Sequence, residues 1–274
     1  MKRRRILAGV VLLAVGVFAV TILKREPSTS RNWAADQALP AASLLDGQIA
    51  TIRNVRNFRY PAGAPPVAGY YDASYDLDSL ETVWFVLTTF SRQWRAPAHT
   101  FVSFGFAGGR YVAISVEARR QAGQTYGIMA GMLRNFELIY VIGDERDLIG
   151  RRAVAEGDNT YLYPVNAPKE RARELFVSML ARANQLQQHP EFYNSITNNC
   201  TSNLVNHVNH VVPGRVPSSW RVMVPGYADE VALSLGLIQA GGSLEAARQK
   251  FLINERAREA IASDSFSLRI RRAS

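Results

Sequence analysis

Cys200 is the residue whose surroundings most favour chemistry. It follows two asparagines in residues 193–202 (YNSITNNCTS) and precedes a run with helical apolar spacing. Asparagine is a strong helix N-cap, so we expect Cys200 in the first turn of a helix. There the positive end of the helix dipole favours the thiolate and lowers the pKa of the thiol. A cysteine at a helix start can equally be packed and inert, so the nucleophile hypothesis needs a partner residue.

His99 is the partner that the pattern favours, because a thiolate nucleophile works with an imidazole. It opens a predicted strand over residues 99–106, and a second predicted strand over residues 111–117 ends in Glu117. A short Gly-containing loop joins the two strands and predicts a hairpin. Glu117 would then orient the His99 ring. Taken singly, a strand histidine is more often structural and a glutamate more often solvated, but the pairing across one hairpin favours both roles.

His207 and His210 share the predicted Cys200 helix and raise the question of a metal. His207 lies seven residues after Cys200, about 10 Å along a helix, which is too far to share one coordination shell. Two histidines do not supply a ligand set, and His189 is expected in a loop. The sequence therefore predicts no metal site and no cofactor.

The elements that position these residues follow from apolar periodicity. Strand patterns precede helical patterns, which favours an α+β fold over alternating α/β. A helix is expected after residue 168, with Asn166 as its N-cap, and the Cys200 helix must end at Pro213. The remaining expected strands are residues 48–60, 81–90, 137–142 and 160–164, and the remaining expected helices are residues 32–45, 228–238 and 243–261.

The N-terminus has the charge pattern of a membrane anchor. An unbroken apolar run occupies residues 6–23, and six cationic residues flank it: Lys2, Arg3, Arg4, Arg5, Lys24 and Arg25. Such a run can cross a bilayer, with the basic residues 1–5 in the cytoplasm. The alternative interpretation is a cleaved signal peptide. The run is longer than usual for a signal peptide, and no Ala-x-Ala type cleavage site follows it. We expect a single-pass bacterial inner-membrane protein whose C-terminal part is periplasmic.

The rest of the chain is almost neutral. The formal charge of +9 falls to +3 when the six flanking residues are set aside, leaving 26 cationic against 23 acidic residues. With no base-reading or stacking motif, nucleic acid is not an expected partner. Cys200 is the only cysteine, so an intramolecular disulfide is excluded even in an oxidising compartment.

Four blocks, in order, resemble the N-terminal periplasmic domain of the Lnb lipoprotein N-acyltransferases. They are AHTFVSFGF from residue 98, ISVEARR from 114, FELIYVIGDERDL from 136 and FYNSITNNCT from 192, within a match covering about residues 33–212. The Asn-Cys turn, with His before Cys in the chain, is also similar to circularly permuted papain-like enzymes of the NlpC and lecithin retinol acyltransferase types. The resemblance divides the chain into a linker (residues 24–31), an Lnb-type domain (32–212) and a helical extension (213–274).

The resemblance implies a papain-like antiparallel sheet packed with helices, and an acyl transfer through a Cys200 thioester. His99 would act as base and then acid, with Glu117 orienting it. The start of the Cys200 helix, with Asn198 and Asn199, would stabilise the oxyanion. Weaker candidates for contacts to a phospholipid or lipoprotein substrate are Arg119, Arg120 and Tyr193.

One departure from the family concerns the whole-protein activity. Family domains are often followed by several membrane spans, whereas no later segment here is long and apolar enough. Three functions therefore remain open: a cysteine acyltransferase on lipids or lipoproteins, a thiol amidase or peptidase on cell-wall peptides, and a non-catalytic binding module with the same fold.

Overall fold

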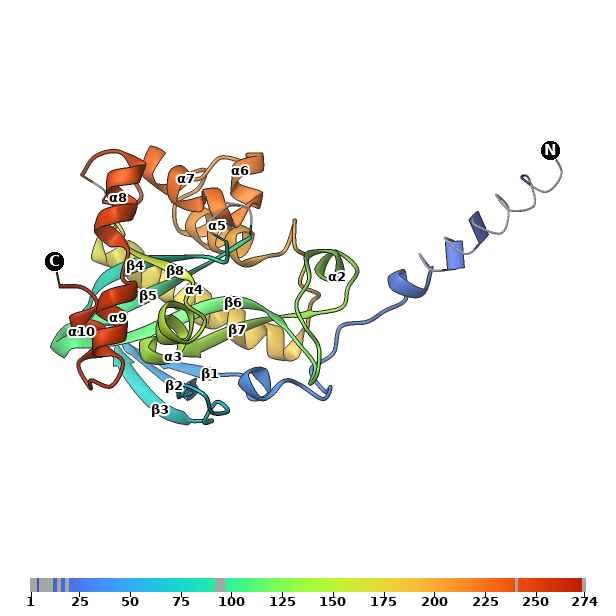
Figure 1. Ribbon diagram of the computed structural model, residues 1–274, viewed down its shortest axis with the longest axis horizontal. Coiled ribbons are helices and arrows are strands. Elements are labelled where there is room, and N and C mark those ends of the chain that lie inside the picture. The colour runs from blue at the N-terminus through green and yellow to red at the C-terminus, as the bar shows by residue number, and fades with distance from the viewer. Residues whose placement is uncertain are drawn as a thin grey trace.

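The computed structural model describes residues 4, 12–13, 16–17, 20–91, 97–239 and 241–272 (Figure 1). The predicted basic end (residues 1–5) and membrane anchor (residues 6–23) lie largely outside these ranges. Within them, no helix combines the length and apolarity needed to cross a membrane.

The described strands form one mixed sheet and, with the helices, give the expected α+β architecture. The strand order is β1-β2-β7-β6-β5-β4-β8, with β3 paired to β2. Neighbours are antiparallel except β2 and β7, which run parallel and meet at Arg56 and Gly143. The strands are β1 (Ala42–Asp46), β2 (Ile49–Arg56), β3 (Tyr70–Asp76), β4 (Leu80–Thr89), β5 (Ala98–Phe106), β6 (Arg110–Arg119), β7 (Glu137–Gly143) and β8 (Asn159–Pro164).

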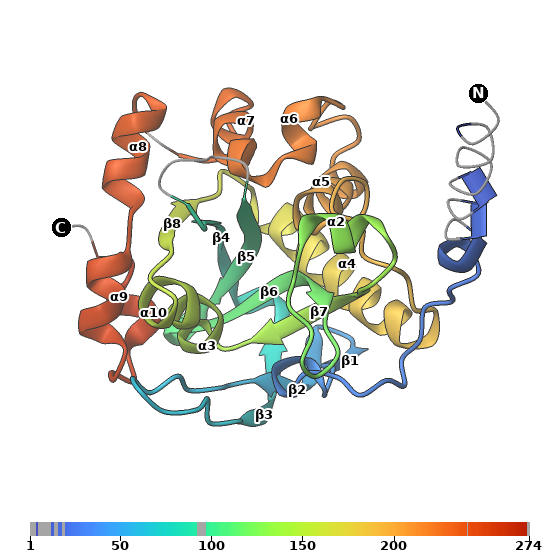
Figure 2. The same ribbon diagram turned by 45° about the vertical axis from the view of Figure 1, so that its right-hand side comes forward.

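Helices cover both faces of the sheet. Figure 2 shows α4 (Lys169–Gln188) and α5 (Cys200–Val211) to one side of β4 to β6, with α9 (Asn254–Ala260) and α10 (Phe266–Arg269) to the other. Side chains alternate between the faces along β5. Phe104 packs on Phe176 of α4, with ring centroids 4.8 Å apart. Phe101 joins a second core with Ala257 of α9 and Phe266 of α10.

The remaining short helices connect these layers. They include α2 (Ile128–Met132), α3 (Glu145–Gly150), a π-helical turn (Arg151–Ala155), α6 (Trp220–Met223), α7 (Ala228–Ser234) and α8 (Leu244–Phe251). Three 3₁₀ turns lie at Ala35–Gln37, Leu77–Ser79 and Ala107–Gly109, and a fourth at Pro225–Tyr227. The described residues of the predicted helical extension, 213–239 and 241–272, thus belong to the same packed body, because Ile253 and Ile270 are buried in the second core.

The predicted hairpin around His99 is confirmed. Strands β5 and β6 pair antiparallel, with Phe101 opposite Ser115. Gly108 and Gly109 turn the chain with φ of 76° and 73°, which suits residues without a Cβ. The strands expected at residues 48–60, 81–90, 137–142 and 160–164 are also present, the first of them ending at Arg56.

The helix predicted over residues 32–45 is wrong. Only a 3₁₀ turn forms there, and β1 follows it and pairs with β2. Asp46 lies opposite Ile49, so Gly47 with φ of 54° belongs to a two-residue hairpin turn. A glycine at the first of the two loop positions suits such a turn, and pairing with β2 outweighs the helical spacing before it.

Three helix boundaries also differ from the prediction. The N-cap of α4 is Pro168 and not Asn166, whose N–H donates to the Leu237 carbonyl. The helix predicted over residues 228–238 stops at Ser234, before Gly236 in the left-handed region. The one predicted over residues 243–261 is broken into α8 and α9, because Leu252 leaves the helix to form a bridge with β8.

Candidate active site

Asn199 fixes Cys200 at the first position of α5. The Asn199 side chain accepts from the Ser202 N–H, and the Ser202 hydroxyl accepts from the Asn199 N–H, which makes a complete capping box. The predicted N-cap is therefore confirmed. The first turn leaves backbone N–H groups without helical acceptors, so the thiol lies at the positive end of the helix dipole.

The structure brings Cys200 and His99 together from elements 101 residues apart in the chain. The two side chains are close enough to interact, and both are buried, with Cys200 only 2% exposed. Burial raises the pKa of the thiol, but the His99 charge and hydrogen bonds from His99 and Thr100 outweigh it and lower the pKa to about 7. A thiol with this pKa is substantially thiolate near neutral pH, as a nucleophile requires.

Ser115 connects His99 to Glu117. The His99 Nε2 lies 2.7 Å from Ser115 Oγ, and that hydroxyl donates to Glu117 Oε1 at 3.0 Å. Since Nε2 is occupied, Nδ1 is the ring nitrogen left for the thiol. Glu117 is therefore linked to the ring through Ser115, a residue that the sequence pattern did not single out.

Glu117 is held as a carboxylate. Burial raises its pKa, but the charges of Arg56 and His99, followed by those of Arg151 and Arg152, lower it to about 2. Its second oxygen accepts from Gln37 Nε2 at 3.0 Å. This fixed negative charge is separated from the His99 ring by a single hydroxyl group.

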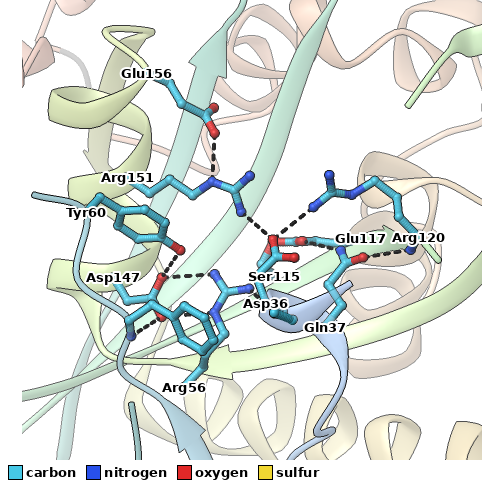
Figure 3. A network of polar contacts seen from close by, with 12 residues as sticks. Asp36, Gln37, Arg56, Tyr60, Ser115, Glu117, Arg120, Asp147, Arg151 and Glu156 are labelled. Carbon is cyan, nitrogen blue, oxygen red and sulfur yellow. Dashed lines mark hydrogen bonds and ion pairs between the residues drawn. The ribbon is translucent and has the colours of Figure 1, made fainter. Parts of the chain in front are cut away.

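An arginine and carboxylate network surrounds Glu117 (Figure 3). Asp36 pairs with Arg120 at 2.9 Å and with Arg151 at 2.8 Å, and Arg151 also pairs with Glu156 at 2.7 Å. The π-helical turn that carries Arg151 and Arg152 directs both side chains to this cluster, and such turns often occur at functional sites. Each arginine is thus held by a carboxylate and not free to rotate.

Arg56 and Asp147 form a buried ion pair below the network. The guanidinium makes two hydrogen bonds to the carboxylate, of 2.9 and 3.0 Å, and Asp147 also accepts from Phe58 N–H and Tyr60 hydroxyl. Both side chains are at most 3% exposed, and Asp147 together with other acidic groups raises the pKa of Arg56 against the opposing effect of burial. This fixed cation is the strongest charge that keeps Glu117 ionised.

The reactive groups open into a cavity of about 390 Å³. Cys200, His99 and Glu117 line it, together with the predicted substrate contacts Arg120 and Tyr193. Burial and the neighbouring Cys200 charge raise the pKa of Tyr193, so this phenol stays protonated beside the thiolate. The other lining residues are Gln37, Phe90, Ala98, Val116, Ala118, Thr125, Tyr126, Arg151, Arg152, Glu156 and Asp158.

Arg119 does not belong to this cavity. It is 6% exposed, donates to the carbonyls of Gln37 and Ala38, and lies over the Trp33 ring at 4.1 Å. Arg120 directly follows the strand, lines the cavity and pairs with Asp36 at 2.9 Å. The predicted Arg119 contact with substrate is corrected to a packing role.

The two asparagines have their amides engaged with the protein. Asn199 Nδ2 donates to the carbonyls of Ser195, Ile196 and Met223, and Asn198 Nδ2 donates to the Phe192 carbonyl at 3.0 Å. Neither side chain lines the cavity. They orient the turn that presents Cys200, and backbone N–H groups of that turn are the available oxyanion donors.

A second, apolar cavity lies on the other side of the α5 first turn. Thr201 is its one polar lining residue, and the others include Leu204, Val205 and Val222. The Cys200 Sγ is 3.9 Å from Thr201 Oγ1, which is also 3.1 Å from Thr100 Oγ1. The threonine pair therefore separates the thiol from an apolar space closed by α6 and α7.

His207 and His210 do not form a metal site in the described part of the chain, where no group of three or more potential ligands occurs. His207 instead contacts Tyr140 hydroxyl at 2.8 Å and Ser178 hydroxyl at 2.7 Å. Burial, followed by the charges of Arg182 and His210, lowers its pKa to about 4. His207 is a neutral structural side chain.

Sequence reasoning missed Ser115 and Gln37. Ser115 has a signal in the sequence, because it lies two residues before Glu117 and so shares its face of the strand. Gln37 has none, because it belongs to a segment predicted as helix and its contact to Glu117 spans 80 residues.

A His–Ser–Glu chain carried by two paired strands thus lies beside a cysteine at the capped start of a helix. The model of the Lnb N-terminal periplasmic domain matches residues 68–226, more than half of the chain. The chain belongs to this family, which is that of a periplasmic domain. No match was found among curated proteins or among solved structures.

Proposed function

We propose that this protein is a membrane-anchored periplasmic cysteine acyltransferase of papain-like type, with lipid or lipoprotein substrates. The observation that carries the proposal is the Cys200 thiol, held at a pKa of about 7 by a hydrogen-bonded His99 at a helix N-terminus. Family membership supports a periplasmic location, and the apolar run at residues 6–23 supports a single-pass inner-membrane anchor.

The chemistry follows from the positions of the groups. The thiolate attacks an ester carbonyl, and N–H groups at the α5 start stabilise the oxyanion. The His99 imidazolium then gives its proton to the leaving alkoxide as the C–O bond breaks, which leaves an acyl thioester on Cys200. His99 next takes a proton from the attacking amine, an amide forms, and the released thiolate regains its imidazolium partner.

The apolar cavity favours an acyl group over a peptide. Its volume of about 90 Å³ suits only the first methylene groups of an acyl chain, which gain free energy from burial against Leu204, Val205 and Val222, whereas a cell-wall peptide would leave its polar groups unpaired there. The Cys200 Sγ lies 3.9 Å from Thr201 Oγ1 and Thr201 lines the apolar cavity, so the threonine pair is all that the acyl chain of a Cys200 thioester would have to pass. On this view α6 and α7 supply a wall of the acyl site.

The test is acyl transfer from phospholipid to a lipoprotein amine by the full-length protein in bilayers. Cys200→Ala and His99→Ala abolish transfer, and Ser115→Ala lowers kcat about tenfold to a hundredfold without raising KM, since general acid–base catalysis is worth about 10² to 10⁴. Retained transfer in Cys200→Ala refutes the proposal.

The same assay separates the two other functions. Cys-dependent release of stem-peptide fragments from purified cell wall, with no transfer, identifies a thiol amidase. If the purified protein has neither activity and a strain with Cys200→Ser grows normally, the protein is a binding module.

A further inference from the structure

Exposed large apolar side chains gather on three neighbouring segments beside the thiol cavity. These side chains are 40–65% exposed, although large apolar side chains on a soluble surface are usually scattered. We call this surface the apolar rim and define it by six residues: Tyr126, Ile128, Met129, Ile196, Trp220 and Met223.

Hydrogen bonds hold the three segments that carry the rim residues next to one another. The Ser195 hydroxyl donates to the Ile128 carbonyl at 2.9 Å and lies 3.2 Å from Tyr126 hydroxyl. The Asn199 amide donates to the carbonyls of Ile196 at 3.3 Å and Met223 at 3.4 Å. Thus α2, the loop before Cys200 and α6 adjoin one another around the residue that caps the nucleophile helix.

The rim also adjoins the place where the N-terminal segment reaches the domain. Arg25 donates to the Leu133 carbonyl at 3.1 Å, and Arg134 donates to the Leu23 carbonyl at 3.0 Å. Leu133 directly follows α2, so the end of the apolar run is held next to the rim. Figure 1 shows the N-terminal segment on the side of the domain where α2 lies.

We propose that the apolar rim is a membrane-docking surface that lies in the outer leaflet of the inner membrane and sets the thiol cavity at lipid level. This inference rests on the proposed function, because it takes residues 6–23 to be in the bilayer. The mixture of Trp, Tyr, Met and Ile suits an interfacial depth. The cations Lys24, Arg25 and Arg134 beside it match anionic headgroups.

Docking gives an acyl donor a direct path to the nucleophile. Tyr126 belongs both to the rim and to the cavity wall, and Phe90, which is 41% exposed, lines the same cavity from the end of β4. A lipid ester that moves out of the leaflet toward the cavity would contact the apolar side chains of the rim on the way. The substrate need not leave the bilayer for water, which removes the largest cost of presenting it.

The single cysteine makes the orientation measurable. Three full-length variants in a Cys200→Ser background each carry one new cysteine, at Met129, Met223 or Leu44. A fluorophore is attached to that cysteine, and its quenching by nitroxide-labelled lipid is measured in vesicles. Leu44 is the matched control, because it is 69% exposed against 65% for Met129 but lies on β1, an edge strand that carries none of the rim residues. We expect at least about twofold stronger quenching at the two rim positions than at Leu44. Equal quenching at all three positions overturns the proposal.

A second arm measures the consequence for transfer. Ile128→Asp with Met129→Asp lowers transfer from bilayer phospholipid about tenfold, because it adds two charges to the docking surface. It leaves alkylation of Cys200 in detergent unchanged, and Leu44→Asp with Leu45→Asp changes neither. Rim quenching without any transfer by the unmodified protein refutes the proposed function and keeps the docking surface. Rim positions that cross-link to each other or to a lipoprotein, and are not quenched by lipid, show a protein interface instead and refute docking.

Discussion

Removing the His99 imidazole is predicted to convert Cys200 from a neutral-pH nucleophile into an ordinary buried thiol. The pKa of the thiol lies at about 7, below its ordinary value of 9.0, although burial alone would raise it. The interactions with His99 and Thr100 therefore favour the thiolate by at least about 3 kcal/mol. In His99→Ala the burial effect remains and the main opposing charge is gone, so the pKa should rise above 9.

The effect on reactivity follows from the fraction of thiolate. At pH 7 about half of Cys200 is ionised in the unmodified protein, whereas a pKa of 9 leaves about 1%, a roughly 50-fold decrease. The more basic thiolate is intrinsically about eightfold more nucleophilic for a Brønsted slope of about 0.4–0.5, so the net loss of rate at pH 7 is about sixfold. The midpoint of the pH profile is therefore a sharper readout than any single rate.

The assay is iodoacetamide alkylation of the full-length protein in detergent between pH 5 and 10. Cys200 is the only cysteine, so every labelled protein reports the site. His210→Ala is the control, because it removes an exposed histidine from the same helix and should keep the midpoint near 7. A midpoint that stays near 7 in His99→Ala would refute the ion-pair reasoning.

Three further predictions concern stability. Asn199→Ala lowers the free energy of unfolding in urea by about 2 kcal/mol, because it removes the helix cap and buried hydrogen bonds. Asn206→Ala, which changes an exposed residue on the same helix, leaves the free energy of unfolding unchanged. Equal effects of the two substitutions would contradict the capping role. The pKa of His207 is lower in the folded state, at about 4, than its ordinary value of 6.5, so protonation favours the unfolded chain. The free energy of unfolding should therefore be unaffected by His207 above pH 6.5 and fall by about 3 kcal/mol as the pH drops to about 4. A His207→Gln variant whose free energy of unfolding depends on pH in the same way would exclude this cause. Asp147→Asn lowers the free energy of unfolding by about 3–5 kcal/mol, because it leaves the Arg56 charge buried without its partner. The double variant Arg56→Met with Asp147→Leu recovers most of this stability. If the losses of the two sites were additive, that result would count against the buried pair.

Local signals in the sequence were sufficient for the elements that hold the nucleophile and its partner. The paired asparagines before an apolar helical run predict the capped start of α5, because capping depends on residues only three apart. The alternation and glycines of residues 99–117 predict the β5–β6 hairpin for the same reason. Local signals predicted the wrong element where pairing with another strand determined the structure. At residues 32–45, for example, the pairing of β1 with β2 outweighs the helical spacing of the apolar residues.

What the sequence determined by itself is the identity of the reactive groups: one cysteine at a helix start, one histidine at a strand start and a glutamate on the next strand. Only the tertiary structure decided how they are connected. Ser115 intervenes between His99 and Glu117, and Arg56 and Gln37 approach Glu117 from segments 61 and 80 residues away in the chain. The pKa values of Cys200 and Glu117 depend on burial and on charges brought near by folding, and these have no counterpart in local sequence. The apolar rim is likewise a tertiary feature, because its members come from three segments that only packing around Asn199 makes adjacent.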